Sequence, residues 1–169
     1  MHTNVTRKTI HLIIIMIKVD IQHATTSPEI PENQQIRKWV KTTLSAVNKK
    51  NRELTVRIID EEECSDLNEQ WRKRTGPTNV LSFPAGNVEQ FTPGFIGDII
   101  LCAPVINREA VEQKKQRDSH WAHMIVHGTL HLLGYDHLKA EEAEKMELLE
   151  IRILESMGIK NPYQLNETI

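Results

Sequence analysis

Residues 127–137 read HGTLHLLGYDH, and this stretch determines both the local fold and the chemistry available to the chain. His127 and His131 are four residues apart, so on a helix their side chains share one face about one turn apart. Gly134 is the residue type that ends a helix in the left-handed conformation, which lets the chain turn back. The segment therefore predicts a helix and a tight turn that bring His137 to the same point as the two helical histidines.

Three imidazoles at one point are the ligand set of a catalytic zinc site. They leave one position of a tetrahedral zinc ion open for water, whereas structural zinc sites are closed by four protein ligands. The spacing H-x3-H-x2-G-x2-H is that of the metzincin zinc proteases. We therefore predict one Zn²⁺ per chain, held by His127, His131 and His137.

Gly128 breaks the analogy with the proteases. In the H-E-x-x-H pattern the second residue is the glutamate that acts as general base, and here that position is glycine. The absence of this glutamate argues against peptide hydrolysis. It also removes a negative charge that would repel a phosphodiester, and we expect it to open space near the metal. A glycine inside a helix costs about 1 kcal/mol relative to alanine, so an alternative reason is that Gly128 permits close helix packing.

Five of the eight histidines fall between positions 120 and 137. His123 shares the face of His127, but a helix is too straight for three successive turns to reach one ion. We expect His123 to support a ligand, contact substrate or have no role, and His120 to lie at the surface or where the helix begins. Asp136 is expected to hydrogen-bond a ligand imidazole or orient a water, or to be a plain surface carboxylate.

The composition is that of an ordinary globular domain. The chain has 169 residues, 39% hydrophobic and 26% charged, with a net charge of −2 that gives no global signature of nucleic-acid binding. An anionic partner would have to meet a local basic patch. The two cysteines, Cys64 and Cys102, are expected to be small buried side chains of a reducing compartment.

Periodicity and turn residues predict an α+β fold, a small mixed four-stranded sheet covered by about five helices. The predicted strands are 18–22, 54–60, 79–83 and 97–102. The predicted helices are 31–47, 60–71, 103–117, 120–133 and 139–157. We expect a single domain over 16–162, an N-terminal extension over 1–15 that is poorly ordered, and a C-terminal tail over 163–169.

The last predicted helix carries an apolar stripe formed by Ala143, Met146, Leu149, Ile153 and Met157. Its acidic residues, Glu141, Glu142, Glu144, Glu147 and Glu150, are expected to form a solvated face over that stripe.

The N-terminus has an apolar run over residues 10–17, preceded by Arg7 and Lys8. Lys18 follows at once, no small-residue cleavage site is evident, and the run is short of the roughly 20 residues that span a membrane. We expect a cytoplasmic protein without a membrane partner, with Met16 as an alternative start.

Arg72, Lys73 and Arg74 form the densest basic cluster. Such a cluster is usually a solvated loop, but a guanidinium near the metal would bind a phosphate with two hydrogen bonds and offset its charge.

Three motifs together resemble one known family. PTNVLSFP at 77–84, GDII at 97–100 and HGTLHLLGYDH at 127–137 resemble the bacterial YbeY-type endoribonucleases and rRNA maturation factors, over about residues 18–162. Residues 67–72, LNEQWR, also match the L-N-x-x-[YW]-R segment of that family. Thr75 departs from it, because many members have an acidic residue in this loop.

The resemblance implies a metal-dependent endoribonuclease that is specific for single strands. It implies a role in 16S rRNA 3′-end maturation and ribosome quality control, with rRNA and ribosomal or small-subunit assembly proteins as partners. It also implies zinc on His127, His131 and His137, and RNA backbone contact by Arg72. The alternatives are a non-catalytic assembly factor with a structural zinc, closed by a fourth protein ligand, and a hydrolase of another substrate such as a peptide. The general base stays open among His123, Asp136 and a second water.

Overall fold

A computed structural model describes residues 16–164, and its centre is one mixed sheet with strand order β1-β2-β4-β3. The strands are β1 (Ile17–Ala24), β2 (Arg52–Ile59), β3 (Val80–Pro84) and β4 (Phe95–Cys102). β2 pairs in parallel with both β1 and β4, and β3 runs antiparallel to β4 at the edge. The predicted α+β class and four-stranded mixed sheet are confirmed. The expected extension over 1–15 and the tail from 165 onward lie outside the described residues.

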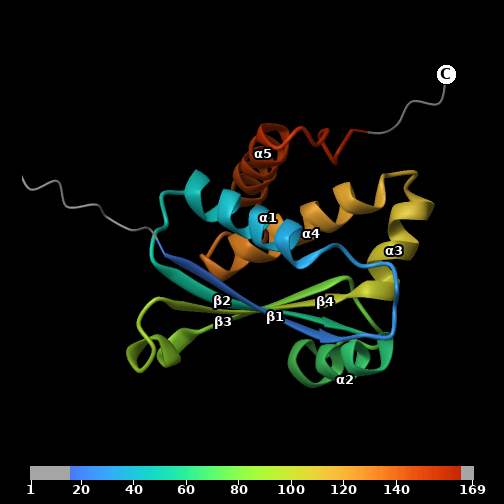
Figure 1. The fold of residues 1–169 in the computed structure, drawn as a ribbon, viewed down its shortest axis with the longest axis horizontal. Coiled ribbons are helices and arrows are strands. Elements are labelled where there is room, and N and C mark those ends of the chain that lie inside the picture. Colours follow the sequence, from blue (N-terminus) through green and yellow to red (C-terminus); the bar gives the residue numbers. More distant parts are fainter. Residues whose placement is uncertain (1–15, 165–169) are drawn as a thin grey trace, which may run out of the picture.

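Five α-helices and one short 3₁₀ helix surround this sheet. They are α1 (Asn33–Ala46), α2 (Glu61–Arg72), η1 (Gly86–Gln90), α3 (Ala103–Glu112), α4 (Arg117–Leu132) and α5 (Ala140–Ser156). Figure 1 shows α1 and α4 on one face of the sheet with α5 stacked outside them, and α2 on the opposite face. The number of α-helices agrees with the prediction.

Helix α4 is the central helix of the fold. Eleven of its 16 residues are buried, because the sheet lies on one side of it and α1, α3 and α5 pack on others. A helix that is apolar around most of its circumference belongs in the interior of a domain. Its fully buried Trp121, Ile125 and Leu130 join the same core as Ile36 and Leu44 from the predicted apolar face of α1.

The boundary between α3 and α4 differs from the prediction. Helix α3 ends at Glu112, and Lys114 has a left-handed φ of 54°, which interrupts the helical hydrogen-bond ladder. Helix α4 then begins at Arg117, three residues earlier than expected. His120 therefore lies in the first turn of the helix, as one of the two expectations had it, and the other, a surface position, is wrong because the residue is 2% exposed.

Two smaller expectations concern burial and membranes. Cys64 and Cys102 are both buried and not disulfide-bonded, as small core residues would be. Within residues 16–164 no helix has the length and apolar character required to cross a membrane.

Candidate metal centre

The end of α4 and the turn after it bring three histidine side chains together. The ring centroids of His127 and His131 are 4.5 Å apart, and those of His131 and His137 are 5.0 Å apart. One ring nitrogen from each of the three lies within 4.8 Å of the other two. The three imidazoles can therefore address a single ion.

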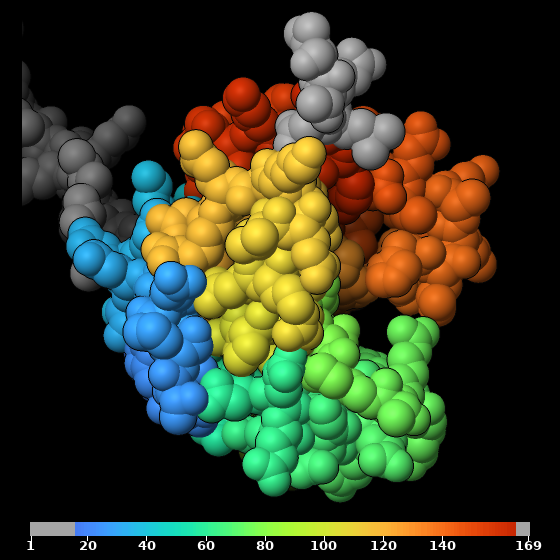
Figure 2. Space-filling model, turned by 90° about the vertical axis from the view of Figure 1, so that its right-hand side faces the viewer, coloured from blue at the N-terminus to red at the C-terminus, as the bar shows by residue number. Residues whose placement is uncertain are grey.

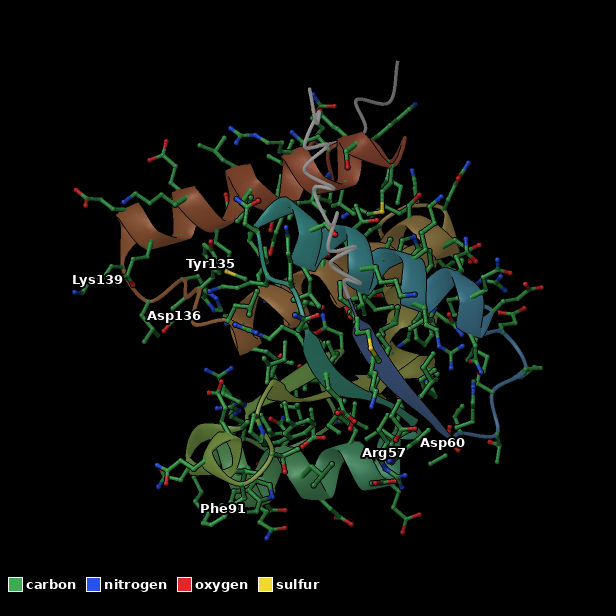
Figure 3. The ribbon with its side chains drawn as sticks, turned by 60° about the vertical axis from the view of Figure 1, so that its left-hand side comes forward. Arg57, Asp60, Phe91, Tyr135, Asp136 and Lys139 are labelled. Atoms are coloured by element: carbon green, nitrogen blue, oxygen red, sulfur yellow. The ribbon has the colours of Figure 1, made fainter. Side chains whose placement is uncertain are left out.

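The turn that positions His137 depends on Gly134. This glycine has a φ of 91°, a left-handed conformation that costs residues with a side chain about 1–2 kcal/mol. The backbone N–H of Tyr135 donates to the carbonyl of Leu130 at 3.2 Å, which closes the end of the helix. Figure 3 shows Tyr135 and Asp136 in this turn, where the chain leaves α4 toward α5. The helix-ending role predicted for Gly134 is therefore observed.

The donor set fits a zinc ion. The Nε2 atoms of His127 and His131 face each other at 3.0 Å. Two imidazoles bound to one tetrahedral zinc at about 2.0–2.1 Å would place their nitrogens about 3.4 Å apart, close to this separation. A cation between them would satisfy both lone pairs, whereas without it only one nitrogen can donate to the other.

His131 is suited to bind a metal at neutral pH. Burial, together with charge repulsion from the neighbouring His127 and His137, lowers the pKa of its imidazole to about 4. The side chain is therefore neutral at pH 7 and presents a lone pair, which is the form of histidine that binds metals.

Glu150 of α5 supports the three-histidine cluster through a hydrogen bond to His127. Its carboxylate is fully buried, and it accepts hydrogen bonds from His127 Nδ1 at 2.5 Å and from His123 Nε2 at 3.1 Å. The Tyr163 hydroxyl donates to it as well. Burial by itself would raise the pKa of Glu150, but the hydrogen bonds from the two histidines prevail and hold it at about 2. The ionised carboxylate fixes the proton of His127 on Nδ1 and leaves Nε2 for the metal.

The expectation that Glu150 belongs to a solvated acidic face is wrong. It lies four residues after Met146 and three before Ile153, so it falls within the apolar stripe of its own helix. A carboxylate at such a position needs a hydrogen-bonding partner in the core, and this spacing is the signal by which the sequence could have revealed it. Tyr163, which the sequence places in the tail, packs on the same carboxylate.

His123 is hydrogen-bonded to Glu150 and is not one of the three clustered histidines. It is 7% exposed, and burial lowers the pKa of its imidazole despite the opposing effect of Glu150. With His127 and Glu150 it forms a second group whose ligand atoms lie within 4.8 Å. The Glu150 carboxylate of this group already accepts hydrogen bonds from both histidines, so these ligand atoms are occupied. The three-histidine group is therefore the better metal site.

The three-histidine cluster opens into a cleft of about 590 Å³. Arg72, the last residue of α2, lines the same cleft; its Nη2 donates to the carbonyl of Ser82 at 2.6 Å and its guanidinium lies 5.4 Å from the ring centroid of Phe83. Asp136 also lines it, but its Oδ1 accepts the backbone N–H of His137 at 2.7 Å and no ligand imidazole. The cleft therefore combines a cation, a carboxylate and the histidine cluster, and His123 does not line it.

Gly128 lies where α4 crosses the sheet. A Cβ atom here would meet Ile99 Cγ2 at 3.0 Å, Val80 Cγ2 at 3.2 Å and Ser82 Oγ at 3.3 Å, and Ser82 already donates to the Gly128 carbonyl. These contacts support the interpretation that the glycine permits close packing. The expectation that it opens space near the metal is wrong, because the sheet fills that space.

Comparisons with known proteins identify the family to which the sequence is similar. Residues 20–158 match the family model described as Endoribonuclease YbeY. Proteins named Endoribonuclease YbeY from two strains of Coxiella burnetii, Dugway 5J108-111 and RSA 493, are each 48% identical over 151 residues, covering 88% of this chain and 99% of theirs.

The fold also has a solved counterpart. The solution structure of TM1509 from Thermotoga maritima matches with a TM-score of 0.55 at 22% identity, and the match covers 88% of this chain and 99% of that one. At this identity the likeness concerns the fold alone. The sequence matches go further: the chain belongs to the endoribonuclease YbeY family.

Proposed function

We propose that this chain is a zinc-dependent endoribonuclease that cleaves single-stranded RNA in the cleft next to His127, His131 and His137. The observation that carries the proposal is that Arg72 lines the same cleft as the three histidines. A positive guanidinium beside a metal-binding cluster is suited to a phosphodiester, and a purely structural zinc has no need of the guanidinium.

The protein groups have distinct tasks in this reaction. In the bound state, a zinc ion would lower the pKa of water toward about 7 and withdraw electron density from a phosphate oxygen. Arg72 holds the phosphodiester and offsets the charge that develops on it. Glu150 keeps the His127 ring in the tautomer and orientation that binding requires. Asp136 lines the cleft and is the carboxylate placed to accept a proton, whereas His123 is buried against Glu150.

Two alternatives have less support. A structural zinc predicts a fourth protein ligand, but within the described residues the ligand group at this site consists of three histidines. A peptidase predicts a carboxylate at position 128, where the chain has glycine and a Cβ atom would already meet the sheet side chains at 3.0–3.3 Å. As the biological role we propose 16S rRNA 3′-end maturation and ribosome quality control in the cytoplasm, with ribosomal or small-subunit assembly proteins as partners.

Metal analysis paired with an RNA cleavage assay tests the proposal. We expect one zinc per chain, cleavage of a single-stranded oligoribonucleotide, little cleavage of the matching duplex and none of casein. Chelation should remove zinc and activity together, and added zinc should restore both. Undiminished RNA cleavage by a verified zinc-free sample would refute the zinc-dependent mechanism.

Cells that contain only a variant lacking His131 should accumulate 16S rRNA with an unprocessed 3′ end, whereas cells with the wild-type chain should not. Normal 3′ ends in these cells would show that 16S rRNA maturation does not depend on RNA cleavage by this protein.

A further inference from the structure

A second pocket, separate from the histidine cleft, lies at the opposite end of α4. It has a volume of about 300 Å³ and shares no lining residue with the cleft. Its wall comes from the turn between α3 and α4, the first turns of α4 and the segment after α5. Figure 2 faces this side of the molecule and shows the α3–α4 region (yellow to light orange) next to the C-terminal segment (red). The residues used below are Lys115, Ser119, His120, His123, Gly158 and Lys160.

Two buried histidines in the wall have unsatisfied nitrogens. His120 is 2% exposed; its Nδ1 has no hydrogen-bond partner, and its Nε2 faces Glu109 at 3.5 Å, too far for a good hydrogen bond. His123 uses Nε2 for Glu150, and its buried Nδ1 is also without a partner. A buried polar atom left unpaired costs about 1–3 kcal/mol, so two of them at one pocket indicate a bound polar group.

The remaining wall is electropositive. The pocket is lined by three lysines and by no carboxylate, and Lys115 and Lys160 are in no ion pair with a described acidic residue. Helix α4 has no side-chain hydrogen bond capping its N-terminus, and Ser119 of its first turn lines the pocket. The first N–H groups and the dipole of such a helix end favour an anion. Three carboxylates lie near this wall but outside the lining: Asp118 in the first turn of α4, Glu109 at 3.5 Å from His120 Nε2, and Glu150 at 3.1 Å from His123 Nε2.

We propose that this pocket binds a phosphate group, either the terminal phosphate of an RNA strand or free inorganic phosphate. Phosphate oxygens accept hydrogen bonds from the helix N–H groups, the Ser119 hydroxyl and the lysines. An imidazole nitrogen can donate to a phosphate oxygen or accept from a protonated one, so the same ligand satisfies His120 and His123. The volume holds a phosphate with part of a sugar and excludes a folded partner.

The pocket is coupled to the metal centre through two hydrogen bonds. His123 in its wall donates to Glu150, and Glu150 accepts from the metal-binding His127. His120 and His127 are seven residues apart, about 10 Å along the helix axis. An RNA end in this pocket would therefore lie close to the cleavage site, an arrangement that rests on the proposed nuclease function. Binding of inorganic phosphate does not depend on it.

Titration of the zinc-free protein with inorganic phosphate tests the pocket without any cleavage. We expect saturable shifts of the backbone amide signals of Ser119 and Gly158, with little change at Gly134 in the histidine cleft. Lys160→Glu should weaken binding at least about ten-fold, the effect of losing one charge-assisted hydrogen bond, and Ser119→Ala by less. Lys41→Glu, the same charge change on the exposed face of α1, is the matched control and should leave phosphate binding unchanged. The absence of saturable shifts, or shifts confined to Gly134, would overturn the proposal.

A second experiment distinguishes the two sources of phosphate. One oligoribonucleotide is compared as its 5′-phosphate, 3′-phosphate and hydroxyl-ended forms on the zinc-free protein. If an RNA end is the ligand, one phosphorylated form binds about ten-fold more tightly, and Lys160→Glu removes the difference. Equal affinity of all three forms, with inorganic phosphate still bound, assigns the pocket to free phosphate. Failure of the nuclease proposal alone would appear as phosphate binding without zinc-dependent cleavage.

Discussion

The two ends of helix α4 both carry histidines, in opposite surroundings. At the C-terminal end His127 and His131 are half-buried, and their facing nitrogens border an open cleft. At the N-terminal end His120 and His123 are less than a tenth exposed, and each ring has a nitrogen without a partner. The spacing between neighbouring histidines is three or four residues throughout, so spacing does not separate the two groups.

What differs is the structure that packs on each end. Helix α3 and the segment after α5 enclose the first turns of α4. The last turn lies beside the short edge strand β3, and the left-handed Gly134 carries the chain away. The open end can hold a metal ion with a position left for water, whereas the closed end can hold only a small polar group.

Replacing one histidine from each end should give the largest contrast. His131→Ala removes one of three zinc ligands, so we expect loss of zinc and at least about a 10³-fold loss of RNA cleavage, since a bound structural zinc is worth about 10–16 kcal/mol in total. His120→Ala should keep stoichiometric zinc, because its side chain lies outside the histidine cleft. Metal analysis and initial rates measure both. Retention of stoichiometric zinc by His131→Ala, or its loss from a folded His120→Ala, would invalidate the contrast.

Glu150→Gln should have the next largest effect, because this residue joins the two ends. The amide supplies one acceptor oxygen where the carboxylate serves two imidazoles and a hydroxyl. We expect zinc affinity to fall about 10–100-fold and the free energy of unfolding to fall by about 3 kcal/mol. Zinc titration and urea unfolding measure these quantities. Glu144→Gln, on the exposed face of the same helix, is the matched control; equal behaviour of the two variants would show that the buried carboxylate has no supporting role.

The two ends of α4 also show how far the sequence alone could go. The helix, the glycine turn and the meeting of three histidines follow from spacing and turn chemistry within eleven residues, and they were predicted. The fold class was predicted from the periodicity of apolar residues, which is also read within short segments of the sequence. The burial of His120 and the role of Glu150 depend on which surfaces α3 and α5 present to α4, which is a matter of tertiary packing. Glu150 was nevertheless detectable, because it interrupts an apolar stripe.

Arg72 tests whether the open end of α4 binds a phosphodiester. Arg72→Ala should leave zinc bound and reduce RNA turnover about 10–100-fold, the effect of losing charge-assisted hydrogen bonds worth about 1.5–3 kcal/mol. Arg72→Lys should recover only part of this loss, because an ammonium cannot form the two-pronged contact. Arg37→Ala in α1 controls for the loss of a positive charge. If the alanine variant also lost zinc, the residue would have a structural role in place of a substrate contact.

The smallest expected effect is the pH dependence of the zinc-free protein. Burial and the neighbouring imidazoles lower the pKa of His131 from 6.5 to about 4, so between these pH values the unfolded chain binds more protons than the folded one. Stability is therefore present above pH 6.5 and is lost as the pH falls toward 4. The full shift corresponds to about 3.4 kcal/mol, and solvent screening at this partly exposed side chain reduces it to about 1–2 kcal/mol. Urea unfolding of the zinc-free protein at pH 7 and pH 4 measures the loss, and His131→Asn, which cannot titrate, should show a loss smaller by that amount. The depressed pKa of Glu150 also contributes below about pH 4.5, but both proteins share this contribution and it cancels from the difference between them. An identical loss in the two proteins would place the acid sensitivity elsewhere and remove the argument that His131 is held neutral for a metal.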